Sequence, residues 1–294
     1  MLLKLESLQP IGAFKLRGAL NAISRLDDAQ KARGVACAST GNHGRAVAYA
    51  AKRQGIRATV CLSSLVPDVK VNAIEALGAE VRRCGDTQDD AEREVRRLVA
   101  EEGIVDIPPF DHPDVIAGQG TIGLELLEDR PDLETLIVPM SGGGLVAGIA
   151  LAAKSIKPSL RVIGVTMDRG AAMAESMAAG KLVDVVELPT LADSLSGGIP
   201  GNRYTFHLCS ELVDEAVLVT EQEIYRGMAA LLLQEGLVAE GGAAVGYAAV
   251  LAGKIEPAGP TAIVISGRNV DMTRLCEIAA GRPVTVGDLV IKPD

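Results

Sequence analysis

Short runs of aliphatic and β-branched residues alternate with helical stretches along most of the chain. A strand that is followed by a helix and then by another strand favours parallel pairing, because the helix returns the chain to the same end of the sheet. In the first half, the pattern predicts strands at 35–39, 58–62, 80–84 and 104–107, with helices at 43–54, 68–77 and 87–101. In the second half, it predicts strands at 136–139, 161–165, 216–220 and 262–266, with helices at 145–154, 221–235 and 243–251. We therefore expect an α/β protein whose parallel sheets are flanked by helices.

The alternation breaks at PPFDHPD, residues 108–114, where prolines interrupt the regular pattern. The opening segment MLLKLES is typical of a strand, but it has no obvious partner in the first series of strands. We therefore expect a discontinuous arrangement, in which residues 34–115 form a small α/β domain and residues 1–33 join 116–294 in a large one. Ligands of open parallel sheets bind at the carboxyl ends of the strands, so the site is expected there.

Composition excludes several classes of function. The formal net charge is −9, which repels nucleic acid, and the chain has no basic stripe interleaved with aromatic residues. No apolar run is long enough to span a bilayer, and the start at Met1 shows no signal-peptide pattern. The 5 cysteines lack a CxxC spacing and the 3 histidines lack a metal-ligand spacing. These features predict a cytoplasmic protein with reduced thiols, no metal, no nucleic-acid partner and no membrane partner.

A glycine run, SGGGL, follows the predicted strand TLIVP and precedes an apolar helix. Gly142, Gly143 and Gly144 would let backbone N–H groups converge on an anion such as a phosphate at the helix N-terminus. A tight structural turn is the simpler alternative. A third alternative is a dinucleotide site, because Gly142, Gly144 and Ala147 fit G-x-G-x-x-A and Asp168 follows the next strand. A nicotinamide-dependent dehydrogenase therefore stays open at this point.

Two further strand ends carry polar residues. In ASTGNHGRAVA, the stretch Ser39, Thr40, Gly41 and Asn42 offers hydroxyls, N–H groups and an amide at the positive end of a helix. Such a turn is suited to a carboxylate, although simple helix capping would use the same residues. In TAIVISGRNVD, an apolar strand ends on Ser266, which taken alone indicates an ordinary turn.

The stretch GAFKLRGA places Lys15 between Phe14 and Leu16, at the start of an apolar helix pattern. A lysine in such a position commonly snorkels to water. The alternative is an amine held inside a site, where it acts as a nucleophile toward carbonyl compounds.

Taken together, these segments resemble the fold-type II family of pyridoxal-phosphate enzymes, which includes threonine and serine dehydratases and serine racemase. GAFKLRGA is similar to the family's G-S-F-K-x-R-G-A motif, STGNH to its S-x-G-N-H loop, and SGGGL to its phosphate loop. AGQGT, EGGAAVG and SGRNVD match further family segments in order, so the resemblance covers essentially the whole chain. It implies a two-domain, tryptophan-synthase-β-like architecture. STGNHGRAVA, ADSLSGGI and NRYTF most resemble the dehydratases of hydroxyectoine utilisation.

The resemblance also implies roles for individual residues. Lys15 would form the Schiff base with pyridoxal 5'-phosphate and take the substrate's α-proton. Asn42 would bind the ring hydroxyl, Ser266 would face the pyridine nitrogen, and Thr40 stands where the racemases carry a hydroxyl acid–base. The full set implied for the cofactor is Phe14, Lys15, Asn42, Gly142, Gly143, Gly144, Leu145, Glu240 and Ser266. The set implied for the substrate is Ser39, Thr40, Gly41, Asn42 and His43.

The implied function is a dehydratase that removes water and ammonia from a threonine- or serine-type β-hydroxy amino acid, and the implied assembly is a homodimer. A serine- or aspartate-type racemase, the nicotinamide-dependent dehydrogenase and a non-catalytic homologue that binds the cofactor remain as alternatives. The sequence departs from the family pattern in four places. Arg268 replaces a glycine, Ser141 replaces the first glycine of a longer phosphate run, and Thr166 stands where some members carry a metal-binding carboxylate. The chain also starts inside the strand that precedes the lysine motif.

Overall fold

The computed structural model describes residues 1–39, 41–66, 68–199, 201 and 203–292, and only the backbone of Val69. The chain divides into two compact units, residues 1–8 with 120–294, and residues 9–119. The domains expected from the sequence remain a prediction. They place residues 9–33 and 116–119 in the large domain, whereas these residues lie in the second compact unit. Within the described part of the chain, no helix has both the length and the hydrophobicity to cross a membrane.

The first unit is built on a parallel sheet in the strand order β1-β9-β6-β7-β8. Its three central strands are almost completely buried, as expected for a sheet that helices cover on both faces. The strands are β1 (Leu2–Leu5), β6 (Thr135–Pro139), β7 (Arg161–Met167), β8 (Glu215–Val219) and β9 (Thr261–Ile265). A hairpin of β10 (Val284–Val286) and β11 (Leu289–Ile291) follows them in the chain.

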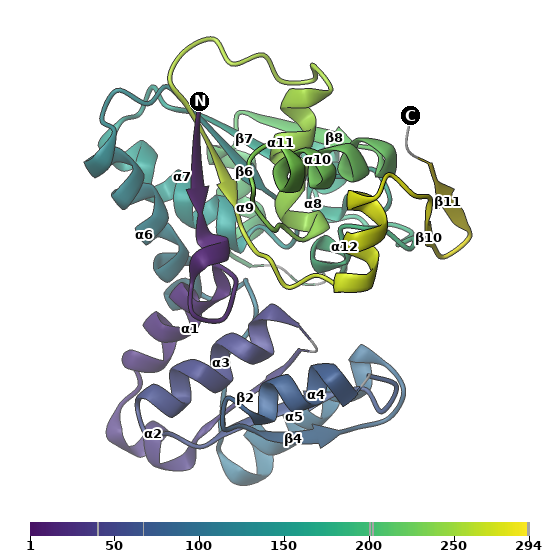
Figure 1. The fold of residues 1–294 in the computed structure, drawn as a ribbon. Helices are drawn as coiled ribbons and strands as arrows, with labels where there is room; N and C mark the ends of the chain where they lie inside the picture. Colours follow the sequence, from purple (N-terminus) through teal and green to yellow (C-terminus); the bar gives the residue numbers. More distant parts are fainter. Residues whose placement is uncertain (40, 67, 200, 202, 293–294) are drawn as a thin grey trace. The chain divides into compact units, whose positions relative to one another are not determined.

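The helices of this unit are labelled in Figure 1. They are α7 (Gly144–Ile156), α8 (Ala172–Ala179), α9 (Thr205–Leu212), α10 (Glu221–Leu233), α11 (Gly241–Leu251) and α12 (Met272–Ala279), with short 3₁₀ turns at Glu6–Leu8 and Asp193–Leu195. Helix α6 (Pro113–Asp129) contributes residues to both units. Each strand from β6 to β8 leads into a turn and then a helix, so the turns lie at the carboxyl ends of the strands.

The second unit contains a smaller parallel sheet in the order β4-β3-β2-β5. Its strands are β2 (Val35–Ala38), β3 (Ala58–Leu62), β4 (Glu80–Arg83) and β5 (Val105–Asp106), and its helices are α1 (Lys15–Ser24), α2 (Asp28–Arg33), α3 (Asn42–Arg53), α4 (Asp68–Glu75) and α5 (Gln88–Glu102). Sequence signals explain the ends of α5: Thr87 and Asp90 form a capping box, and Gly103 ends the helix with a left-handed φ of 66°.

Helix α1 belongs to this second unit because its apolar face is part of the same core as α3. Leu16, Ala19 and Ile23 pack in one cluster with Val47 and other residues of α3. A glycine allows a second close contact, since a Cβ on Gly118 of α6 would lie 2.6 Å from the Gly18 Cα. Helix α1 is therefore held on two sides.

Among the described residues, each sheet ends in strands that pair with a neighbouring strand on one side only. In the second unit, β4 has the sequence EVRR and β5 has two residues. In the first unit, β1 has the sequence LLKL and β8 has the sequence EAVLV.

Candidate active site

Lys15 is the first residue of α1 and is half-buried. A turn brings the chain to this point: the Gly12 N–H donates to the Gln9 carbonyl at 2.7 Å, with a left-handed φ of 76° at Gly12. The Lys15 amine donates to the Pro109 carbonyl at 2.6 Å and lies 5.2 Å from the centre of the Phe14 ring. The protein therefore holds this amine by a directed hydrogen bond, as a site residue requires.

The turn between β2 and α3 presents backbone groups at a helix N-terminus. Gly41 is the N-cap of α3 and makes no side-chain cap, while its N–H donates to the Ser39 hydroxyl at 3.3 Å. The first N–H groups of a helix have no partner within the helix, so they are suited to a carboxylate. Thr40, predicted as a hydroxyl acid–base, lies outside the described residues.

His43 lies in the first turn of α3 and is 3% exposed. Its Nε2 lies 2.7 Å from the Ile107 carbonyl. A carbonyl only accepts, so Nε2 carries a proton. Burial and, to a smaller extent, the nearby charge of Lys15 lower the pKa of His43 to about 3, so the ring is neutral near pH 7. The His43 side chain therefore bonds to the protein backbone, and its role in binding the substrate stays a prediction.

The glycine run connects β6 to α7 in the other unit. Gly143 is the N-cap of α7 with a left-handed φ of 88°. A Cβ at this position would lie 2.8 Å from the Met173 Cε and 2.9 Å from the Cys209 Sγ, so only glycine fits. The first turn of α7 carries no acidic residue. The loop therefore fits a phosphate group, which its backbone N–H groups and the helix dipole would hold.

Ser266 and Glu240 are both buried, each 4% exposed. Ser266 directly follows β9, at the carboxyl end of that strand. The carboxylate of Glu240 accepts from the Asn269 N–H at 3.1 Å, and a Cβ on Gly267 would lie 2.7 Å from its Oε1. The Arg268 side chain is exposed, so the arginine that replaces the family's glycine does not fill the surroundings of Ser266.

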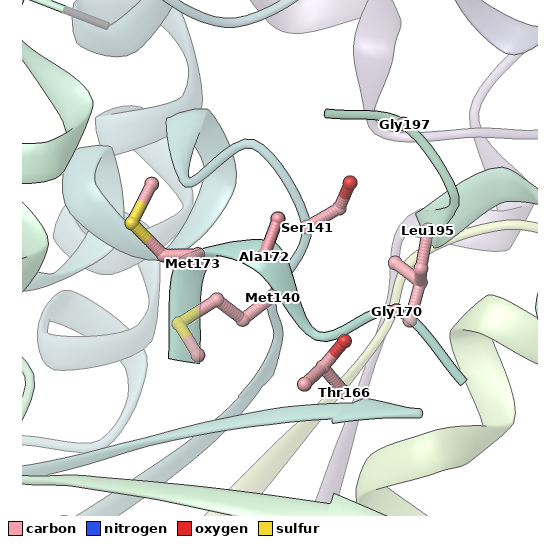
Figure 2. Close-up of a pocket in the computed structure, with 8 residues that line it drawn as sticks. All are labelled: Met140, Ser141, Thr166, Gly170, Ala172, Met173, Leu195 and Gly197. Carbon is pink, nitrogen blue, oxygen red and sulfur yellow. The ribbon is translucent and has the colours of Figure 1, made fainter. Parts of the chain in front are cut away.

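A small pocket lies beside the glycine run in the same unit (Figure 2). Ser141 and Thr166 line it with their hydroxyl-bearing side chains, while Met140, Met173 and Leu195 supply apolar groups. Thr166 is 3% exposed and supplies no charge where some family members carry a metal ligand. Within the described ranges, no group of three or more histidine, cysteine, aspartate or glutamate side chains could hold a metal ion.

The sequence reasoning missed the part that Ile107 and Pro109 play. Both contribute backbone carbonyls, to His43 and to Lys15 respectively. The segment PPFDHPD was identified only as a break in the pattern. A carbonyl acceptor leaves no signature in residue type, so only the proline pair could have drawn attention to it.

Comparison with known proteins identifies the class to which this chain belongs. The family described as "Pyridoxal-phosphate dependent enzyme" matches residues 1–267, and the chain belongs to this family. Its cofactor is pyridoxal 5'-phosphate. The fold class, the enzyme class and the cofactor predicted from the motifs are thereby confirmed, and the nicotinamide alternative is not supported.

Individual members of the family are similar to this chain over most of its length. A protein of Sinorhizobium fredii, whose name places it provisionally among the threonine dehydratases, is 54% identical over 281 residues, which cover 95% of this chain and 85% of the relative. "L-threonine dehydratase catabolic TdcB" of Escherichia coli K12 is 44% identical over 279 residues, 94% of this chain and 84% of the relative. The structure of maize serine racemase matches with a TM-score of 0.88 and 37% identity, covering 94% of this chain and 85% of that one.

Proposed function

We propose that this chain is a pyridoxal-phosphate-dependent ammonia-lyase that removes water and ammonia from a β-hydroxy amino acid of the threonine or serine type. The observation that carries the proposal is the half-buried Lys15 amine, which is held at 2.6 Å by the Pro109 carbonyl at the start of α1. The relatives named as threonine dehydratases support the reaction type and the substrate class.

Each predicted site residue has a role that its chemistry allows. The cofactor, when bound, withdraws electrons from the substrate's α-carbon. Lys15 takes the α-proton on Nζ, and Gly142, Gly143 and Gly144 hold the phosphate through backbone N–H groups. The buried Ser266 hydroxyl bonds to the ring nitrogen without supplying a charge.

The remaining residues orient the two reactants. The Ser39–Asn42 turn binds the substrate carboxylate, Asn42 bonds to the ring hydroxyl, and Phe14 packs beside Lys15. Leu145 and Glu240 complete the cofactor surroundings. The β-hydroxyl leaves as water, the released enamine tautomerises to an imine, and one water hydrolyses the imine, so that the net products are a 2-oxo acid and ammonia.

The test is a product screen with the purified, cofactor-loaded chain. L-threonine, L-serine, threo-3-hydroxyaspartate and opened hydroxyectoine derivatives are offered separately, and 2-oxo acid and ammonia are measured together. Equal amounts of both products from at least one substrate support the proposal. Cofactor absorbance without release of 2-oxo acid from any substrate would instead indicate a non-catalytic homologue.

A racemase is the second candidate, favoured by the similarity to maize serine racemase and by the identity of Thr40. The neutral Ser266 favours elimination, because a group that supplies no charge to the ring nitrogen makes prompt loss of a β-leaving group the easier outcome. We therefore expect D-isomer only as a minor product. D-serine that forms faster than 2-oxo acid, and that is suppressed selectively in Thr40→Ala, would reverse the assignment.

The assembly and the domain division are also proposals. The family resemblance favours a homodimer in the cytoplasm, and light scattering of the purified chain measures the oligomeric state. The expected small domain of residues 34–115 lies entirely within the second compact unit.

A further inference from the structure

Lys15 and His43 both bond to one three-residue segment, Ile107–Pro109. His43 Nε2 lies 2.7 Å from the Ile107 carbonyl, and Lys15 Nζ lies 2.6 Å from the Pro109 carbonyl. Lys15 is the first residue of α1 and His43 is the second residue of α3, in the same compact unit. The segment therefore links the position of the lysine amine to that of the histidine ring.

The backbone of this segment can make few other bonds. Ile107 directly follows β5, and its N–H donates to the Ala36 carbonyl of β2 at 2.9 Å. Pro108 and Pro109 have no N–H, so the ladder cannot continue through them. Their φ angles are restricted by the rings, and the direction of the Pro109 carbonyl depends on how the Ile107 peptide is fixed. The ring Nε2–H of His43 donates to the Ile107 carbonyl and so fixes that peptide.

We propose that His43 is a positioning residue, which fixes Ile107–Pro109 so that the Pro109 carbonyl holds the free Lys15 amine where it reacts. The proposal rests on the proposed function, in which Lys15 links to the cofactor. That linkage joins Nζ to the aldehyde carbon and expels the aldehyde oxygen as water. In the reaction cycle the substrate amine displaces Lys15, and the freed amine then needs an acceptor that keeps it close.

The neutral state of His43 suits this role. Its Nδ1 is buried and has no hydrogen-bond partner among the described residues, so the ring gains nothing from the protein by taking a second proton. A protonated ring would also place a second positive charge near Lys15. The donor at Nε2 is thus the part of the side chain that positions the segment.

The experiment measures cofactor capture, not turnover. The full chain is stripped of cofactor and mixed with pyridoxal 5'-phosphate in a stopped-flow instrument, at a series of cofactor concentrations. The concentration dependence separates the dissociation constant of the first complex from the first-order linking step. We expect His43→Leu to slow the linking step about tenfold, because a misplaced amine reacts slowly, while the dissociation constant stays within about threefold.

A conservative variant distinguishes positioning from packing. In His43→Gln, the amide nitrogen can still donate to the Ile107 carbonyl, and the linking step is expected to return to within about threefold of wild type. The exposed His207 provides the matched control, and His207→Leu should link at the wild-type rate. A wild-type linking rate in His43→Leu, or no rescue by glutamine, would overturn the proposal.

Two further variants keep the outcome interpretable. If His43→Leu does not fold, Pro108→Gly loosens the half-exposed segment without altering the histidine, and the same slowing is expected. Lys15→Ala tests the proposed function separately, since it should bind the cofactor without linking to it. Linkage that persists in Lys15→Ala refutes the lysine assignment, whereas its loss together with normal linkage in His43→Leu and Pro108→Gly refutes only the role of His43.

Discussion

Glu221 and His43 are buried in different compact units, and pH acts on them in opposite directions. Glu221, at the start of α10, is 3% exposed and accepts from the Leu191 N–H at 2.7 Å and from the Thr190 hydroxyl. Burial raises its pKa despite these hydrogen bonds. Burial lowers the pKa of His43. In both units burial disfavours the charged form of the side chain. The charged form is the deprotonated one in Glu221 and the protonated one in His43, so the two groups respond in opposite directions when the pH changes.

The signs follow from linkage. A carboxyl group whose pKa is raised by folding contributes stability below its unfolded-state pKa, and that contribution is lost as the pH rises through its folded-state pKa. A histidine whose pKa is lowered contributes stability above its unfolded-state pKa, and that contribution is lost as the pH falls. A single pH optimum measured on the whole chain therefore combines two opposed dependences, which only variants in each unit can separate.

Lys15→Ala is expected to have the largest effect of the changes considered. It removes the reactive amine from one unit and leaves the glycine run of the other unit unchanged. We expect turnover to fall by about four orders of magnitude, since no other amine replaces the proton-transfer group. The long-wavelength absorbance of the lysine-linked cofactor should disappear as well. The exposed Lys70 serves as the control, and Lys70→Ala should keep both properties. An unchanged spectrum in Lys15→Ala would show that another residue links the cofactor.

Acidification tests the contribution of His43 to the free energy of unfolding. Its pKa falls from 6.5 to about 3 on folding, so the unfolded chain takes up a proton between these values and the folded chain does not. Between pH 7 and pH 5 this residue should cost about 2 kcal/mol of the free energy of unfolding. Urea unfolding at the two pH values measures the loss, which His43→Gln should remove.

Glu221→Gln tests the dependence of stability on pH in the other unit, where the expected sign is opposite. Because folding raises the pKa of Glu221, the wild-type chain should lose stability as the pH rises through the folded-state value, and the glutamine variant should lose less. The same sign of change in both variants would contradict the contrast between the units.

Gly143→Ala tests the phosphate loop, where the expected effect is smaller. The left-handed φ and the contacts with Met173 and Cys209 should cost about 2 kcal/mol, and the cofactor dissociation constant should rise about 30-fold. Gly253 is the matched control, because it has a φ of 68° and a Cβ there would meet nothing within 4 Å. Gly253→Ala should lower stability slightly and leave cofactor affinity unchanged. Equal affinity losses in both variants would exclude a specific role for the loop.

The smallest effect is expected from chelation of divalent metal ions. The pocket beside the glycine run presents Thr166 with methionine thioethers, whereas magnesium and calcium prefer several carboxylate or carbonyl oxygens. Turnover after treatment with a chelator should change by less than about twofold, well below the effect of a lost ligand residue. A large loss that returning magnesium or calcium reverses would contradict this expectation.

The regular part of the fold could be predicted because strand and helix periodicities are local. The strand predicted at 58–62 is β3 without change, and the helix predicted at 87–101 differs from α5 by one residue at each end. The helices α2, α6, α8, α9 and α12 and the hairpin near the C-terminus were not predicted. In α6, Pro113 begins the helix and three glycines interrupt its apolar pattern, so local composition gives only a weak helix signal there. The break predicted at 108–114 includes only the first two residues of this helix.

The candidate site was predictable to the extent that side chains or glycines define it. The lysine motif and the glycine run are short continuous signals, and the structure places both at helix N-termini, as the motifs indicate. The exposure of Arg268 could not be read from its identity, because the direction of a side chain after a strand end depends on the turn. The burial of His43 also depends on a carbonyl 64 residues away in the chain.

The short, charged edge strands of the second unit affect how this protein can be handled at high concentration. Glu80 and Arg83 are exposed on β4, and β5 offers only two residues to a partner strand. Edges of this kind resist strand addition by other molecules, which protects against fibrous aggregation. The apolar edges β1 and β8 have less protection of this kind, so a lysine substituted at the exposed Leu218 of β8 is the change that would favour long storage and crystallisation at high protein concentration.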